Sequence, residues 1–240
     1  LHRVDRRQRQ MCIRDRNESP EKMDDFFNTR ASIYDVQQIK NIDGGDKCYQ
    51  EIARYIPSNA KALLDLGCGT GLELESIFKK LSTVEVTCVD LANKMLEKLA
   101  QKYSGHSINL INDNYLTADL GVQKYDVAIS IMSFHHLIHP VKLKLYSNIF
   151  QCLKPNGIFV ECDYMIGSND SDLEEHYLGE REKLQSQYNL TEGLYHYDIP
   201  FTIKHEILLL REAGFQSVKQ VWGIETVSYT HLRAHETRED

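Results

Sequence analysis

The residues with the clearest chemical potential form a glycine-rich turn after the apolar run 62–66. An acid and three glycines occupy every second position there: Asp65, Gly67, Gly69 and Gly71. Glycines permit a tight turn and let a ligand approach the backbone closely. The spacing differs from the G-x-G-x-x-G of dinucleotide-binding turns, because Leu72 stands where the third glycine would fall. Glu73 and Glu75 would repel a polyphosphate. The motif alone therefore leaves two interpretations open, a non-phosphate ligand or a plain turn.

Polar residues also end the next two apolar runs. Asp90 follows the run 84–89, where a carboxylate can accept both ribose hydroxyls of a nucleoside, although it could instead cap the next helix. Asp113 and Asn114 follow the run 108–112. A side-chain acceptor and a backbone N–H at that point could contact an adenine edge, but polar residues are common at strand ends.

Candidate catalytic residues follow two later runs. His135 and His136 come shortly after the run 125–131, and a histidine of near-neutral pKa can serve as a general base. Either histidine could equally have a structural role, as a helix cap or in packing. Asp163 ends the run 157–163, and its carboxylate could line a pocket or face solvent. These residue types leave two interpretations open, general-base catalysis and a structural role.

The elements that must position these residues alternate regularly. The run 62–66 and four later apolar runs predict strands, at 84–89, 108–112, 125–131 and 157–163. Helical spacing occupies the segments 46–56, 72–81, 93–103, 141–153, 171–188 and 202–213, and a further strand is predicted over Phe215 to Trp222. This order predicts an α/β fold with a doubly wound, mostly parallel sheet. Ligands of such sheets bind at the carboxyl ends of the strands, which is where the candidate residues fall.

Composition sets the two ends of the chain apart. Eight of the twelve arginines lie in residues 1–16 and 227–240, whereas the 210 residues between them carry 20 basic and 30 acidic residues. Both end segments resemble translated sequencing-adapter sequence. We therefore predict a non-native or disordered extension over 1–16, one domain over 17–226 and a non-native tail over 227–240.

Composition also excludes several partners. No stretch approaches 18 uninterrupted apolar residues, so no membrane-spanning helix is predicted. The acidic body disfavours nonspecific binding to nucleic acid or to an anionic membrane. The six cysteines include no CxxC pair, so we expect no metal site and a reduced, cytoplasmic protein.

Taken together, these motifs resemble the class I S-adenosylmethionine-dependent methyltransferases. The resemblance rests on the segments 63–71 (LLDLGCGTG), 125–130 (YDVAIS) and 153–158 (LKPNGI) together with Asp90, and it extends over about residues 22–226. It implies a seven-stranded, Rossmann-like sheet whose last strand is antiparallel. That strand would begin at Ile224 and run into the suspected tail, so it could be damaged.

The resemblance also implies a set of residues that bind S-adenosylmethionine. Gly67, Gly69 and Gly71 would line its methionine part with Cys68 and Ile131, and Asp65 would lie near its amino group. Asp90 would hold the ribose, Leu91 would cover the adenine, and Asp113 and Asn114 would meet the adenine edge. Tyr34 matches a helix that covers the cofactor in related enzymes.

The residues after the fourth predicted strand indicate the substrate class. Enzymes that methylate base amines or glutamine amides carry Asn/Asp-Pro-Pro-Tyr/Phe at this point, whereas this chain has Ser133-Phe134-His135-His136. The double histidine resembles small-molecule methyltransferases. We therefore expect methyl transfer to a small molecule, with His135, His136 and Asp163 as catalytic candidates. The alternatives are a nicotinamide-dependent oxidoreductase and a cofactor-binding domain without transferase activity.

Overall fold

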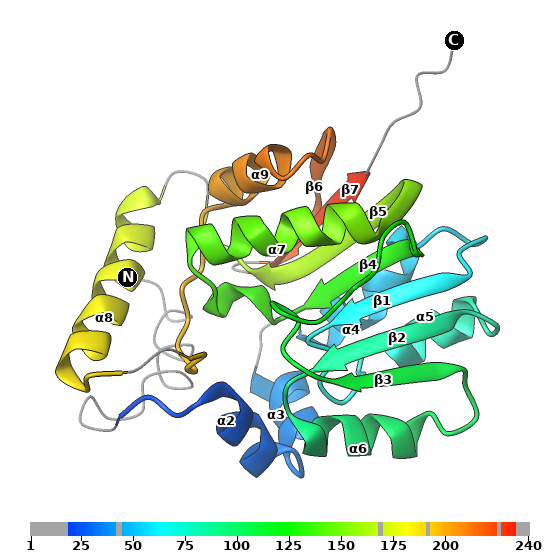
Figure 1. Ribbon diagram of the computed structural model, residues 1–240, viewed down its shortest axis with the longest axis horizontal. Coiled ribbons are helices and arrows are strands. Elements are labelled where there is room, and N and C mark those ends of the chain that lie inside the picture. Colours follow the sequence, from blue (N-terminus) through cyan, green and yellow to red (C-terminus); the bar gives the residue numbers. More distant parts are fainter. Residues whose placement is uncertain (1–18, 42–44, 168–169, 191–192, 225–226, 234–240) are drawn as a thin grey trace.

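One sheet runs through the protein, and helices cover both of its faces (Figure 1). The computed structural model describes residues 19–41, 45–167, 170–190, 193–224 and 227–233. The predicted extension over 1–16 and the end of the predicted tail, 234–240, lie outside these residues.

The strands occur where the apolar runs predict them. They are β1 (Ala62–Leu66), β2 (Glu85–Asp90), β3 (Ile108–Asn112), β4 (Tyr125–Ile131), β5 (Leu153–Tyr164), β6 (Ser217–Ile224) and β7 (Val227–Arg233). Their order in the sheet is β3-β2-β1-β4-β5-β7-β6, and β1 to β5 pair in parallel. The prediction of an α/β, Rossmann-like fold with a parallel sheet is confirmed.

Three of the described helices precede β1, and five lie between strands. They are α2 (Met23–Arg30), α3 (Tyr34–Asn41), α4 (Gly45–Glu51), α5 (Leu74–Lys80), α6 (Asn93–Lys102), α7 (His139–Cys152), α8 (Ser171–Gln187) and α9 (Ile203–Glu212). Short 3₁₀ turns occupy Ile52–Tyr55 and Phe134–His136. Helix α7 begins two residues before its predicted start, because a proline in the first turn of a helix loses no hydrogen bond.

Alternate residues of the central strands face two separate cores. On β1, Leu63 packs into a core with α4, α5 and α6, whereas the adjacent Leu64 packs into a core with α7 and α9. Both leucines are fully buried. Because the side chains of a strand alternate between the faces of a sheet, a continuous apolar run is what a strand covered on both faces requires.

The last strand lies between two others. β7 pairs antiparallel with β5, from Tyr164 opposite Val227 to Ile158 opposite Arg233, and antiparallel with β6 on its other side. The predicted domain boundary at residue 226 therefore falls between β6 and β7. Ladder hydrogen bonds connect backbone groups, so a strand can pair with little dependence on which side chains it carries.

The direction of the chain reverses between β1 and β4. The chain passes outward from β1 through β2 to β3 and then returns to β4 on the other side of β1. A crevice opens at the carboxyl ends of the strands at such a reversal. None of the described helices is long and apolar enough to cross a membrane.

Candidate functional site

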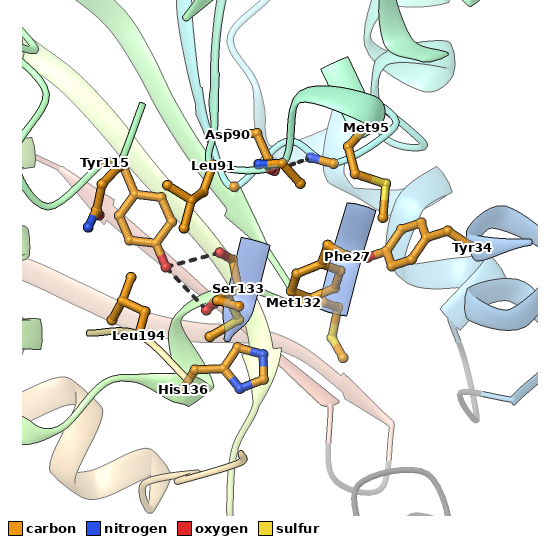
Figure 2. Close-up of a pocket in the computed structure, with 15 residues that line it drawn as sticks. Phe27, Tyr34, Asp90, Leu91, Met95, Tyr115, Met132, Ser133, His136 and Leu194 are labelled. Carbon is orange, nitrogen blue, oxygen red and sulfur yellow. Dashed lines mark hydrogen bonds between the residues drawn. The ribbon is translucent and has the colours of Figure 1, made fainter. Parts of the chain in front are cut away.

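A pocket lies at this reversal, at the carboxyl ends of β1, β2 and β4 (Figure 2). The space between its walls is about 570 Å³, open solvent at its mouth included. Seven residues singled out from the sequence line it: Tyr34, Gly67, Gly69, Asp90, Leu91, Asn114 and His136. The pocket therefore brings together residues from both of the predicted groups, cofactor-binding and catalytic.

The glycine turn lets the backbone approach the opposite wall of the pocket. Gly67 has a φ of +71°, and a Cβ atom on it would lie 2.1 Å from the Ser133 Oγ. Only glycine fits that space. At Gly69, where φ is +51°, a Cβ atom would lie 3.7 Å from the ring of Tyr34. Gly71 lies away from the pocket and packs against Leu74 and Leu99, so its part is to shape the turn.

Asp90 connects the glycine turn to the start of α6. One carboxylate oxygen accepts a hydrogen bond from the Gly69 N–H at 2.8 Å, and the other accepts from the Ala92 N–H at 2.8 Å. Burial raises the pKa of Asp90, while these two N–H groups act to lower it. A carboxylate oxygen has two lone pairs, so each oxygen keeps one acceptor site for a ligand hydroxyl. Leu91, next in the chain, also lines the pocket.

Two buried carboxylates lie under the turn without full partners. Asp65 Oδ2 and Glu73 Oε1 are buried and have no hydrogen-bond partner among the described residues. Burial raises the pKa of both groups, and the charge of Glu73 raises that of Asp65 further. Glu73 lines a smaller cavity beside the pocket, together with Cys68 and Ile131. Unpartnered carboxylate oxygens here suit a ligand that carries an ammonium group.

The side chains of the two residues after β3 point to different environments. Asn114 lines the pocket, and its side-chain oxygen accepts a hydrogen bond from the Leu116 N–H. Asp113 is exposed and outside the pocket, where its carboxylate accepts from the Asn114 N–H. Of the predicted pair, only Asn114 is placed to contact a bound ligand, because the Asp113 side chain turns back to its own backbone.

The N-terminal helices cover the mouth of the pocket. Tyr34 at the start of α3 lines both cavities, and Phe27 of α2 packs against its ring at a centroid distance of 5.9 Å. Figure 2 shows the ring of Tyr34 beside the side chains of Met95 and Phe27. Aromatic and thioether side chains form an apolar cover that excludes water from this end of the site.

His136 is the one predicted catalytic residue that lines the pocket. Its Nδ1 lies 3.0 Å from the carbonyl oxygen of Tyr197, which can only accept, so Nδ1 carries the proton and Nε2 carries the lone pair. Burial, followed by the nearby imidazoles of His135 and His196, holds the pKa of His136 well below 6.5. The side chain is therefore neutral at pH 7.

His135 and Asp163 lie behind His136. One oxygen of Asp163 contacts the His135 Nδ1, and the other accepts from the N–H groups of Phe134 and His135 at 2.7 and 2.9 Å. Burial acts to lower the pKa of His135, but the carboxylates of Asp163 and Asp198 outweigh it, and the pKa lies above 6.5. Asp163 therefore holds the turn that carries both histidines and does not line the pocket.

Several lining residues were not singled out from the sequence, and most of them are apolar or aromatic. They are Met23, Phe27, Ala92, Met95, Tyr115, Met132, Ser133 and Leu194. Apolar residues with helical spacing predict a core equally well, so no local pattern separates these from core positions. Tyr115 carried a usable signal, since it directly follows the predicted pair Asp113 and Asn114.

The fold and the pocket together define an α/β protein with a pocket at the point where the strand order of its sheet reverses. Residues 64–159 match the model of a family described as "Methyltransferase domain". The chain is 26% identical over 223 residues to a carboxy-S-adenosyl-L-methionine synthase of Nautilia profundicola, which covers 86% of the chain and 92% of the relative. It is 28% identical over 134 residues to a malonyl-[acyl-carrier protein] O-methyltransferase of Priestia megaterium, with 55% and 47% covered.

Solved structures share the fold. A putative O-methyltransferase from Nostoc punctiforme superposes with a TM-score of 0.68 at 15% identity, over 96% of this chain and 67% of that one. Human N-acetylserotonin methyltransferase, solved with S-adenosylmethionine, gives 0.60 at 16% identity, and this chain spans 88% of its own length and 55% of that protein. Residues 64–159 thus carry a methyltransferase domain, and the chain shares the fold of S-adenosylmethionine-dependent methyltransferases.

Proposed function

We propose that the pocket binds S-adenosylmethionine along the carboxyl ends of β1, β2 and β3 and transfers its methyl group to a small-molecule acceptor beside His136. The observation that carries the proposal is the arrangement of carboxylates around the glycine turn. Asp90 offers two acceptor sites at the position of a ribose, and unpartnered oxygens of Asp65 and Glu73 lie where an amino-acid ammonium would sit.

Each part of the pocket has a role in binding. Gly67 and Gly69 let the methionine end of the ligand pass close to the backbone, and Tyr34 covers it. Leu91 and Asn114 flank the adenine, and Tyr115 and Met95 close the apolar sides of the pocket. The bound sulfonium supplies an activated methyl group: a bond forms from the acceptor atom to the methyl carbon as the carbon–sulfur bond breaks, its electron pair going to sulfur.

The residues of the chain then orient the acceptor and take up its proton. Holding the acceptor atom in line with the methyl group can supply roughly 7–11 kcal/mol of rate acceleration. His136 accepts the proton of the acceptor hydroxyl or amine at Nε2, because its Nδ1–H is held by the Tyr197 carbonyl. His135 and Asp163 act as positioning residues, since they fix the turn that carries His136.

A small acceptor is favoured by the form and charge of the site. The pocket is lined mainly by apolar and aromatic side chains, and its described lining includes no lysine or arginine that could grip a nucleic-acid backbone. The net charge of −7 points the same way. Cys68, Cys88 and Cys152 are free thiols, which suits the cytoplasmic location that we propose.

The test is product formation with a panel of small phenols, alcohols and amines, measured as release of S-adenosylhomocysteine by mass spectrometry. His136→Gln should reduce turnover by about 100-fold or more, in line with the loss of a general base. His139→Gln is the matched control, because His139 is exposed at the start of α7 and lies outside the pocket. Equal turnover of both variants would contradict the role of His136.

A second candidate is the conversion of S-adenosylmethionine to its carboxylated form, as in the name of the Nautilia profundicola relative, which the chain matches over 92% of its length. An acidic carboxyl donor would need a fixed cation in the pocket, and the described lining offers none. The same mass-spectrometric assay separates the two activities, since only the second yields a carboxylated S-adenosylmethionine.

A further inference from the structure

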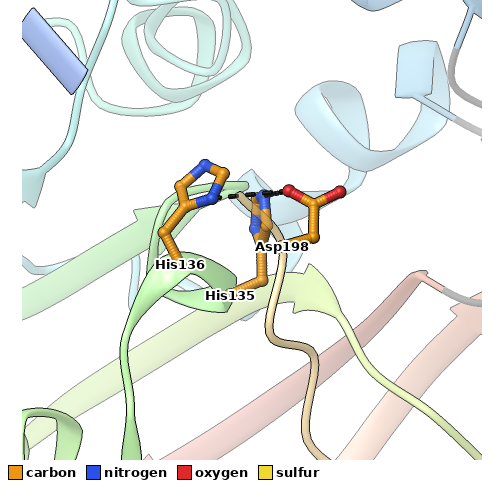
Figure 3. Close-up of side chains that lie close together, drawn as sticks. All are labelled: His135, His136 and Asp198. Carbon is orange, nitrogen blue, oxygen red and sulfur yellow. Dashed lines mark ion pairs between the residues drawn. The ribbon is translucent and has the colours of Figure 1, made fainter. Parts of the chain in front are cut away.

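A cluster beside the pocket combines three side chains that can ligate a metal. His135 and His136 come from the turn after β4, and Asp198 comes from the segment between α8 and α9 (Figure 3). Each offers one ligand atom, and these atoms lie within 4.8 Å of one another. His135 and His136 are buried and Asp198 is half-buried, so the cluster is shielded from bulk solvent.

The distances suit a small transition-metal ion. Asp198 Oδ1 lies 3.5 Å from the His135 Nε2 and 3.4 Å from the His136 Nδ1. Ligand atoms bound at about 2.1 Å to a tetrahedral ion lie about 3.4 Å apart. Figure 3 shows the carboxylate of Asp198 directed at the edges of both imidazole rings. The two separations from Asp198 match this spacing, and the two histidine nitrogens lie within 4.8 Å of each other.

The carboxylate oxygen at the centre of the cluster lacks a hydrogen bond. Asp198 Oδ1 is buried and has no hydrogen-bond partner among the described residues. A buried carboxylate oxygen without a hydrogen bond has lost its hydration, and the two imidazole nitrogens at 3.4 and 3.5 Å replace it only in part. A cation bound between Asp198 and the two histidines would satisfy it. This orphan oxygen is an observation independent of the distances.

The surroundings also orient the ligands. Asp163 contacts the Nδ1 of His135, which leaves Nε2 directed at Asp198. A carboxylate that holds the far nitrogen of a ligating histidine is the usual outer partner at metal sites. His136 can ligate through Nδ1 once its proton moves to Nε2, a change of tautomer with no net loss of a proton. The Tyr197 carbonyl oxygen, 3.0 Å from this Nδ1, is then close enough to be a further oxygen donor.

We propose that His135 Nε2, His136 Nδ1 and Asp198 Oδ1 bind a divalent transition-metal ion of the Zn²⁺ or Fe²⁺ type. Two imidazole nitrogens and one carboxylate favour such ions over Mg²⁺ and Ca²⁺, which prefer sites made of oxygen ligands. Ion binding does not depend on which acceptor the enzyme methylates. It has one consequence that rests on the proposed function: with the proton on Nε2, His136 cannot accept a proton from the acceptor, so the bound ion inhibits base-dependent transfer.

The first test is competition for Zn²⁺ between the chelator-stripped full chain and a chromophoric chelator, without S-adenosylmethionine. The wild-type protein should bind one equivalent tightly, and Asp198→Asn should weaken this binding by about 10–100-fold or more. Asp172→Asn is the matched control, since Asp172 is an exposed acid in the first turn of α8, and its binding should equal wild type. Equal affinity of the wild type and a folded Asp198→Asn variant would overturn the proposal.

A second measurement needs no variant. Nitrogen NMR of histidine-labelled wild-type protein during the Zn²⁺ titration should shift one ring nitrogen each of His135 and His136 to the position of a metal ligand. The exposed His139 and the half-buried His205, whose Nδ1 and Nε2 atoms lie 3.2 Å apart, serve as an internal comparison. Shifts confined to that pair, with His135 and His136 unchanged, would also overturn the proposal. Neither result depends on methyltransferase activity, so failure here is distinct from failure of the proposed function.

Discussion

The replacement of Asp90 by asparagine gives the sharpest test of how the pocket holds its ligand. The two carboxylate oxygens of Asp90 accept the N–H groups of Gly69 and Ala92, both at 2.8 Å. In Asp90→Asn one of these oxygens becomes an NH₂ group, so one buried N–H faces a donor. Leaving such a donor unsatisfied costs about 1–3 kcal/mol of folding stability.

The same change weakens ligand binding by a separate route. One ribose hydroxyl loses its charged acceptor, and a hydrogen bond to a charged group contributes about 1.5–3 kcal/mol. At 1.4 kcal/mol per tenfold, the dissociation constant of S-adenosylhomocysteine should rise about 10- to 100-fold. Isothermal titration calorimetry measures this change, and denaturant unfolding of the same samples measures the loss of stability.

Asp113→Asn is the matched control for Asp90→Asn. Both changes replace an aspartate by an asparagine near the carboxyl end of adjacent strands, but Asp113 is exposed and its carboxylate accepts from the backbone N–H of Asn114. Its affinity for S-adenosylhomocysteine should therefore match that of wild type. Two results would refute the reasoning: unchanged affinity in a folded Asp90→Asn variant, or an equal loss in both variants.

Three further predictions follow from the same contacts. Gly67→Ala should lower the midpoint of thermal unfolding, because a residue with a side chain loses about 1–2 kcal/mol in this left-handed backbone conformation and the new Cβ would clash with the Ser133 Oγ. The second change Ser133→Gly should recover part of this loss. If it recovers none, the clash is not the cause. Binding of S-adenosylhomocysteine should release protons from the protein, because the ammonium group of the ligand lowers the raised pKa values of Asp65 and Glu73. Isothermal titration calorimetry in buffers of different ionisation enthalpy detects this release. Equal heats of binding in all buffers would contradict the prediction. Burial lowers the pKa of His196 from 6.5 to about 4, so the unfolded chain takes up a proton at a higher pH than the folded chain does. The free energy of unfolding should therefore decrease by up to about 3 kcal/mol as the pH falls from 6.5 towards 4. His196→Gln should flatten this part of the dependence of stability on pH, measured by urea unfolding.

Much of the fold follows from local sequence patterns. The runs that became β1 and β4 are apolar at consecutive positions, and in a chain where strands alternate with helices such runs predict a parallel sheet covered on both faces. The turn from Gly67 to Gly71 could also be predicted from the sequence, because its alternate glycines indicate a tight turn. The structure explains why glycine is needed there: the φ angles are positive and the backbone approaches Ser133 closely. The strand ends placed Asp90 and Asn114 at the pocket for the same reason, since all the parallel strands end at one edge.

What local patterns could not supply is the direction of individual side chains outside regular elements. Asp113 and Asn114 are neighbours, yet one turns to solvent and the other lines the pocket. His135 and His136 likewise diverge on a 3₁₀ turn, where strand alternation gives no guide. Asp163 has the residue type of a pocket carboxylate, but three backbone N–H groups and the imidazole of His135 occupy its oxygens.

The sequence by itself thus determined the class of fold, the cofactor turn and the strand ends at which chemistry can occur, because these depend on period, glycine and the order of elements. Only the tertiary structure decided which polar residues face the pocket and which hold others in place. It alone brought Asp198 to His135 and His136, because the segment before α9 folds back over the turn after β4. Contacts between segments distant in the chain depend on packing, and no local spacing encodes them.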